Sequence, residues 1–306
     1  MVLFFIVCIL IALVLGGSYY AYRIAFYNSY SNRDQKPSVS GEQYDAFRPR
    51  MREIYHKLND RPCEYVSIES RDGLTLSGRY YHVADGAPLD IGFHGYRSNP
   101  MTDFSGGSEL SFDMGHNLLL VDQRAHGQSA GRTITFGIKE RWDLLSWVEY
   151  ALKRFGADTK ILLYGVSMGG ATVLMASEME LPENVKGIIA DCPYSSPMDV
   201  IVHVGRSYPI PNWLIRPFVI LGAKVFGGFD VNEVSAAEAV KNTRVPILIL
   251  HGDADTYVPC HMSDIAAANP KMVSRHVIPG AEHGISYLVD TPRYRQIVTD
   301  FMEQIL

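Results

Sequence analysis

The chain has few cysteines and no surplus of positive charge, and these shortages exclude several classes of protein. Its 306 residues contain four cysteines, none of them in a C-x-x-C pair or at the Cys/His spacing of a metal site. We therefore expect free thiols, no disulfide and no bound metal. The net charge is −5 at pH 7 and no basic patch is visible along the chain, which argues against a nucleic-acid-binding protein.

Charged side chains are absent from residues 1–22. A helix of this length spans roughly 33 Å at about 1.5 Å per residue, which is enough to cross a hydrocarbon core of about 30 Å. Tyrosines at the end of the run, followed by Arg23, suit a membrane interface. A cleaved signal peptide is the alternative, but the run has no basic residue before it and no clear A-x-A site. The pattern favours an uncleaved single-pass anchor, and the basic residues that follow it predict a cytoplasmic main domain.

The segment after this run changes in composition twice before the main domain begins. Residues 28–41 are polar, as in a short linker, and residues 42–58 have apolar side chains at helical spacing. We therefore assign residues 1–22 to an anchor, 23–59 to a linker and N-terminal helix, and 60–306 to one domain that is large enough to bury a core.

The main domain begins with a hairpin pattern and continues with alternating strands and helices. Residues 64–70 and 74–82 flank a turn at Gly73, where glycine supplies the positive φ that the turn needs. The alternation that follows predicts a mostly parallel sheet with helices on both faces. It is interrupted at about residues 193–233, which are rich in proline and apolar side chains, and we interpret this insertion as a small helical cap.

The pentapeptide Gly165-Val166-Ser167-Met168-Gly169 matches the G-x-S-x-G nucleophile elbow. Residues 161–164 are an apolar run typical of a buried strand, and residues 171–179 are rich in helix formers. A strand, turn and helix of this kind hold the serine in a strained conformation that only small neighbours tolerate, so that its hydroxyl projects from the sheet. Ser167 is therefore the candidate nucleophile.

A serine hydroxyl needs a histidine to take its proton and a carboxylate to orient that histidine. The apolar strand expected at residues 245–250 runs into a loop that contains Asp255, which we choose as the acid. Asp253 in the same loop is a competitor, although its side chain could instead shape the loop through local hydrogen bonds. Asp191, after an earlier strand, is the second alternative.

The candidate base is His283, chosen from ten histidines by its position. It follows the last expected strand, at residues 271–278, and precedes the last expected helix, at residues 287–305. The order serine, aspartate, histidine is that of the α/β-hydrolase arrangement. His251 is expected to pack and hydrogen-bond in its loop.

An acyl-transfer site also needs two donors for the oxyanion, commonly backbone N–H groups. One should come from the residue after the nucleophile, which is Met168. The other should come from a loop after an earlier strand, and the strand expected at residues 89–93 ends just before Tyr96. We predict that the backbone N–H groups of Tyr96 and Met168 form the oxyanion hole.

Five ordered motifs make the chain resemble the serine hydrolases of the α/β-hydrolase superfamily, in particular bacterial lysophospholipase-like and acylaminoacyl-peptidase-like members with one N-terminal membrane segment. These motifs are residues 93–96, 121–129, 165–170, 251–255 and 282–284. The resemblance implies an α/β-hydrolase fold with a mostly parallel eight-stranded sheet, helices on both faces and a cap. It also implies a triad of Ser167, Asp255 and His283, and no cofactor.

The function expected from these observations is hydrolysis of carboxylic esters through an acyl-enzyme. The apolar cap favours a hydrophobic acyl or aromatic group in a small or lipid-like ester. Side chains that could reach the substrate pocket are His94, Arg124 and Trp213. An acyl-peptidase, amidase or thioesterase using the same triad is the alternative, and a non-catalytic membrane-tethered binding protein is the third possibility. No oligomeric state is predicted.

Overall fold

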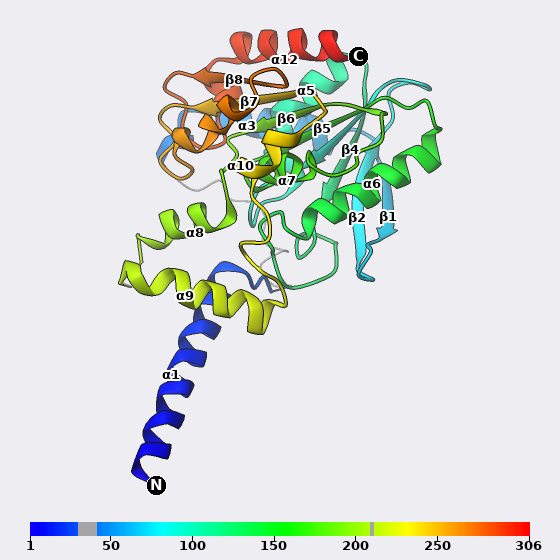
Figure 1. The fold of residues 1–306 in the computed structure, drawn as a ribbon. Coiled ribbons are helices and arrows are strands. Elements are labelled where there is room, and N and C mark those ends of the chain that lie inside the picture. Colours follow the sequence, from blue (N-terminus) through cyan, green and yellow to red (C-terminus); the bar gives the residue numbers. More distant parts are fainter. Residues whose placement is uncertain (30–41, 209–210) are drawn as a thin grey trace.

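The computed structural model describes residues 1–29, 42–208 and 211–306. Figure 1 shows a central sheet between two layers of helices, with helix α1 (Val2–Ala25) projecting away from this body. Most of the linker expected at residues 28–41 lies outside the described residues. Asn28 itself is buried, and its side chain donates to the Ala125 carbonyl, so the chain joins the domain directly after α1.

Eight strands form one mixed sheet in the order β1-β2-β4-β3-β5-β6-β7-β8. Strand β2 is antiparallel to its two neighbours, and the strands from β4 to β8 in this order are parallel. The expected hairpin and the mostly parallel sheet are therefore confirmed. The strands are β1 (Glu64–Glu69), β2 (Thr75–Tyr81), β3 (Leu89–Phe93), β4 (Asn117–Asp122), β5 (Ile161–Val166), β6 (Val185–Asp191), β7 (Ile247–Gly252) and β8 (Val273–Ile278).

The central strands are apolar on both sides because helices cover both faces of a parallel sheet. Successive side chains of a strand point to opposite faces. In β5, Ile161 and Leu163 belong to one core cluster with helices α6 (Glu140–Phe155) and α7 (Met168–Ala176). Leu162 and Tyr164 belong to a second cluster with α3 (Arg48–Asn59) and α12 (Thr291–Ile305). The two clusters are the two sides of the same sheet, and the carboxyl ends of the parallel strands meet at one edge.

The helices of the main body differ in places from the expected bounds. Helix α3 begins only at Arg48, because Pro49 favours a helix start there, and residues 42–44 form a separate 3₁₀ turn. The last expected helix is two helices, since the Asp290 side chain caps a new helix by accepting from the Arg293 N–H. The helices are α3 (Arg48–Asn59), α4 (Pro100–Asp103), α5 (Ser105–Asp113), α6 (Glu140–Phe155), α7 (Met168–Ala176), α10 (Ala236–Ala239), α11 (Ser286–Val289) and α12 (Thr291–Ile305), with 3₁₀ turns at Glu42–Tyr44, Val240–Asn242 and Cys260–Ala268.

The insertion at about residues 193–233 is helical. It contains α8 (Pro197–Gly205), α9 (Asn212–Gly222) and a π-helical turn at Ala223–Gly227. Figure 1 shows α9 crossing α1 where α1 leaves the main body. Among the described residues, α1 is the one helix that is long and apolar enough to cross a membrane. Most of its side chains are exposed, and the buried ones, Ser18 and Tyr22, lie in its C-terminal half.

Candidate active site

Ser167 lies in the tight turn between β5, which ends at Val166, and α7, which begins at Met168. Its backbone has φ 55° and ψ −114°, a conformation that a non-glycine residue adopts only under strain. The turn has no space for a side chain at Gly165 or Gly169, two residues before and two residues after the serine. A Cβ at Gly169 would overlap the Phe93 carbonyl, and one at Gly165 would overlap the backbone of Gly169. The two glycines therefore allow the strained turn that carries Ser167 at the end of the sheet.

Three side chains from separate loops converge at this turn. The Ser167 Oγ lies 3.0 Å from His283 Nε2, and His283 Nδ1 lies 2.7 Å from Asp255 Oδ2. Asp255 follows β7 and His283 follows β8, so neighbouring parallel strands deliver both residues to the same edge. The structure thus brings together all three residues that the sequence predicted as a triad.

Asp255 is held as a carboxylate. Burial acts to raise the pKa of its carboxyl, but hydrogen bonds from His251, His283 and the Val258 N–H act in the opposite direction, and the net pKa is about 2. Its other oxygen, Oδ1, accepts from the N–H groups of Tyr257 and Val258 at 3.0 and 2.8 Å. A carboxylate can only accept a hydrogen bond. His283 Nδ1 must therefore carry a proton, which leaves Nε2 free to accept the proton of Ser167.

The two alternative acids have other partners. Asp253 Oδ1 accepts from the Gly280 N–H at 2.7 Å and joins two loops, which is the shaping role considered for it. Asp191 is buried, and Tyr294 donates its hydroxyl to Asp191 Oδ2 at 2.8 Å. His251 Nε2 donates to the Val258 carbonyl at 2.8 Å and lies 3.4 Å from Asp255 Oδ2. His251 therefore helps to hold the acid loop.

The loop after β3 lies directly against Ser167. A Cβ built on Gly95 would be 3.4 Å from the Ser167 Cβ. The loop is fixed on both sides of Tyr96, because the Gly95 N–H donates to Asp103 at 2.6 Å and the Arg97 N–H donates to His126 Nε2 at 2.9 Å. Met168 is the first residue of α7, where a backbone N–H has no partner within the helix. These positions are compatible with an oxyanion hole at the two predicted N–H groups.

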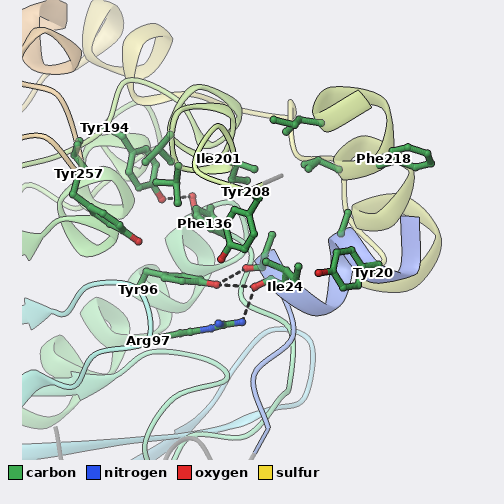
Figure 2. A pocket seen from close by; sticks show the side chains of 18 of the residues that line it. Tyr20, Ile24, Tyr96, Arg97, Phe136, Tyr194, Ile201, Tyr208, Phe218 and Tyr257 are labelled. Carbon is green, nitrogen blue, oxygen red and sulfur yellow. Dashed lines mark hydrogen bonds between the residues drawn. The ribbon is translucent and has the colours of Figure 1, made fainter. Parts of the chain in front are cut away.

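A cavity of about 460 Å³ begins at Ser167 and runs beneath the cap, which is within the range of small-molecule pockets. Figure 2 shows the aromatic side chains Tyr96, Phe136, Tyr194 and Tyr257 gathered at its inner end. The outer end is lined by residues of α8, α9 and α1. Most of the lining is apolar, so the cavity suits a hydrocarbon chain or an aromatic group.

The three side chains predicted to reach this cavity do not line it, and that prediction is corrected. His94 is buried, and its ring binds the Gly95 carbonyl and the Gln123 N–H. Arg124 forms ion pairs with Asp143 at 2.6 Å and Asp72 at 2.9 Å, away from the nucleophile. Trp213 is 76% exposed on the outer side of the cap. The first two are structural residues near the site, and the third faces away from it.

Sequence reasoning did not find three of the aromatic residues that line the cavity. Phe136 follows β4, Tyr194 follows β6 and Tyr257 follows Asp255 in the acid loop. Their common signal is an aromatic residue after an expected strand, which is too frequent to be selective. The contribution of α1 had no signal at all, because a membrane-span pattern says nothing about contacts with a distant domain.

Cys192, Asp255 and His283 place possible metal-ligand atoms within 4.8 Å of one another. Burial raises the pKa of the Cys192 thiol well above its ordinary value, and the thiolate is the form that binds metals. The other two residues are already hydrogen-bonded to each other. This cluster therefore fits a proton relay better than a metal centre.

The buried carboxyl of Asp191 leads to a prediction about how the free energy of unfolding depends on pH. Burial raises the pKa of its carboxyl to about 6 in the folded protein. A carboxyl with a raised folded-state pKa stabilises the fold at low pH, and this stability is lost as the pH rises through 6. Between pH 5 and 7.5 the loss is on the order of 1 kcal/mol. We expect Asp191→Asn to lack this loss when the free energy of unfolding is measured in urea at both pH values.

The exposed Asp158 provides the control for this experiment, because Asp158→Asn should keep the pH dependence of the wild-type protein. If the Asp191→Asn protein loses as much stability as the wild type between pH 5 and 7.5, the buried carboxyl does not titrate as described.

Known proteins resemble this chain in sequence and in structure. The family described as alpha/beta hydrolase fold matches residues 92–209. The uncharacterized protein YqkD of Bacillus subtilis is 29% identical over 244 residues, which are 78% of this chain and 78% of YqkD. The lysophosphatidylserine lipase ABHD12 of Xenopus tropicalis is 26% identical over 211 residues, or 62% of this chain and 50% of that protein.

Among solved structures, the esterase Pf2001 of Pyrococcus furiosus superposes with a TM-score of 0.68 at 20% identity, over 89% of this chain and 97% of that chain. The eight-stranded sheet with its single reversed strand, the flanking helices and the strand-turn-helix at Ser167 agree with this similarity. The chain is an α/β-hydrolase-fold protein.

Proposed function

We propose that the protein hydrolyses carboxylic esters through an acyl-enzyme on Ser167. The observation that carries this proposal is the continuous hydrogen-bonded series Ser167 Oγ, His283 Nε2, His283 Nδ1 and Asp255 Oδ2, with distances of 3.0 and 2.7 Å. This geometry meets the requirement that nucleophile, base and orienting acid lie within hydrogen-bond reach.

The proposed reaction has two steps. His283 Nε2 takes the hydroxyl proton as Ser167 attacks the ester carbonyl, and the N–H groups of Tyr96 and Met168 bind the oxyanion. His283 then gives this proton to the leaving alcohol, and the acyl group stays on the serine. A water molecule repeats the sequence and releases the carboxylic acid. Asp255 remains ionised throughout and stabilises the imidazolium that forms at each step.

The cavity favours esters with an apolar acyl group. Its lining is mostly aromatic and aliphatic from Ser167 outward, and burial of apolar surface is the main source of affinity in such a site. Two similar proteins support this choice, since Pf2001 is named an esterase and ABHD12 a lysophosphatidylserine lipase.

We also propose that α1 anchors the protein in a membrane with the main domain in the cytoplasm. The exposed apolar surface of α1 and the basic residues after it support this placement.

The test compares p-nitrophenyl esters of increasing acyl length with aminoacyl p-nitroanilides. We expect kcat/KM to rise from the acetate to the medium-chain esters by about fourfold for each buried methylene, and the anilides to react far more slowly. Preferential cleavage of the anilides would favour the acyl-peptidase alternative. Absence of turnover on all substrates, together with no labelling by a fluorophosphonate, would overturn the proposal.

A further inference from the structure

The C-terminal part of α1 is built into the domain. Tyr22 is buried, and its hydroxyl lies 2.9 Å from the Thr133 Oγ1. Phe26, directly after the helix, is fully buried, and its ring packs edge-on against Phe136 and Phe229 at centroid distances of 5.7 and 5.1 Å. Cleavage behind α1, as for a signal peptide, would remove or expose these core contacts.

Helix α1 also packs closely against cap helix α9. A Cβ on Gly17 would lie 2.8 Å from the Phe218 ring, and a Cβ on Gly222 would lie 2.5 Å from the Ser18 carbonyl. Small residues at these positions let the two helix backbones approach closely, as at interfaces between membrane helices. The position of the cap is therefore set in part by α1.

The loop that carries Tyr96 is attached to the same helix end. The Tyr96 hydroxyl donates to the Ala25 carbonyl at 2.9 Å, and Arg97 Nη2 donates to the Ile24 carbonyl at 2.8 Å. Figure 2 shows both side chains reaching from the inner end of the cavity to the last turn of α1. These carbonyls are unpaired within a helix terminus, so the loop satisfies them.

One wall of the cavity is α1 itself. This wall consists of Gly17, Tyr20, Ala21, Ile24 and Ala25. It extends from Gly17 to Ala25, which is roughly 12 Å of helix at a rise of about 1.5 Å per residue. Helix α9 lines the same cavity through Leu214, Ile215, Phe218 and Val219, and Figure 2 shows it beside α1. An acyl chain that extends from Ser167 through this cavity would therefore contact both helices.

We propose that α1 is retained in the functional protein and forms one wall of the acyl pocket, which binds esters of long unbranched aliphatic acids. The inference rests on the proposed ester hydrolysis and adds the substrate class and the residues that select it. The apolar helix then has two roles, because the residues before Gly17 project from the domain while those after it contact the substrate.

Ala21→Phe tests this wall by placing a phenyl ring in the cavity that α1 and α9 line. With full-length protein in detergent, we expect kcat/KM for p-nitrophenyl dodecanoate to fall by about fourfold for each methylene displaced, or about 60-fold for three, and kcat/KM for the acetate to change by less than about threefold. The matched control is Ala12→Phe, an exposed position on the same helix about half a turn around its axis. It should leave both values unchanged.

Ile24→Ala gives an independent result because it enlarges the pocket and leaves the Ile24 carbonyl in place. We expect kcat/KM for the hexadecanoate to rise severalfold relative to the dodecanoate, with the exposed Ile11→Ala as the control. A different outcome is that the wild type cleaves esters and reacts with a fluorophosphonate while neither Ala21→Phe nor Ile24→Ala alters the chain-length profile. In that case α1 does not form a wall of the acyl pocket, and the esterase proposal stands. The proposal that α1 is retained would also be overturned if the intact mass of the protein extracted from membranes showed that residues 1–25 are missing.

Discussion

Ser167→Ala should lower kcat for an activated ester by about 10⁶-fold, provided that chemistry limits turnover. The substitution removes the atom that attacks the carbonyl, and no neighbouring group can replace it. In the part of the chain that the structure describes, the side chain of Ser167 hydrogen-bonds to His283. Alanine is no larger than serine, so the fold should persist. The measurement is hydrolysis of p-nitrophenyl butyrate, with fluorophosphonate labelling as a second reading of the nucleophile.

Two further measurements show that the loss of activity comes from the missing hydroxyl and not from unfolding. The unfolding midpoint should stay close to that of the wild type, since the Ser167 N–H still donates to the Asp191 carbonyl at 2.8 Å. Labelling should disappear completely, because the probe reacts with the serine hydroxyl. Near-normal turnover in the alanine protein would show that another residue attacks the ester and would remove the basis of the proposed mechanism.

Asp255→Asn should lower kcat by about 10⁴-fold through the tautomer of His283. Oδ1 accepts from the N–H groups of Tyr257 and Val258, so the asparagine oxygen should occupy this position. Its NH₂ group would then replace Oδ2 and face His283 Nδ1. Because an NH₂ group is a donor, Nδ1 must become the acceptor and the proton must move to Nε2. In this tautomer Nε2 cannot take the proton of Ser167.

Asp253→Asn is the matched control, since it is the same change two residues earlier in the same loop. Asp253 Oδ1 accepts from the Gly280 N–H, and an asparagine oxygen can accept this bond equally well. The kcat of the Asp253→Asn protein should stay within about twofold of the wild-type value, because the hydrogen bond is kept and the substitution has a small effect. Comparable losses in the two variants would mean that the loop as a whole, rather than one carboxylate, supports His283.

The convergence of Ser167, Asp255 and His283 could be predicted because each of them is positioned by a local pattern. The glycines around Ser167 mark a turn that excludes side chains, and Asp255 and His283 each follow an apolar run that predicts a strand. Since carboxyl ends of parallel strands share one edge of the sheet, position along the chain is enough to bring such residues together. The same reasoning could not assign roles to His94 and Arg124. His94 also binds Gln123, and Arg124 pairs with Asp72 and Asp143, which belong to other segments of the chain.

The sequence by itself determined the strand and helix alternation, the strained serine turn and the positions of Ser167, Asp255 and His283 after their strands. These depend on backbone preferences and on side-chain periodicity over short segments. Only the tertiary structure decided what surrounds them. Trp213 faces outward, whereas Ala21 and Ile24 of the N-terminal helix line the cavity that begins at Ser167. The physical reason is that the pocket is formed by segments up to 241 residues apart, from Gly17 to Val258. Their approach depends on packing over the whole molecule, which no local pattern records.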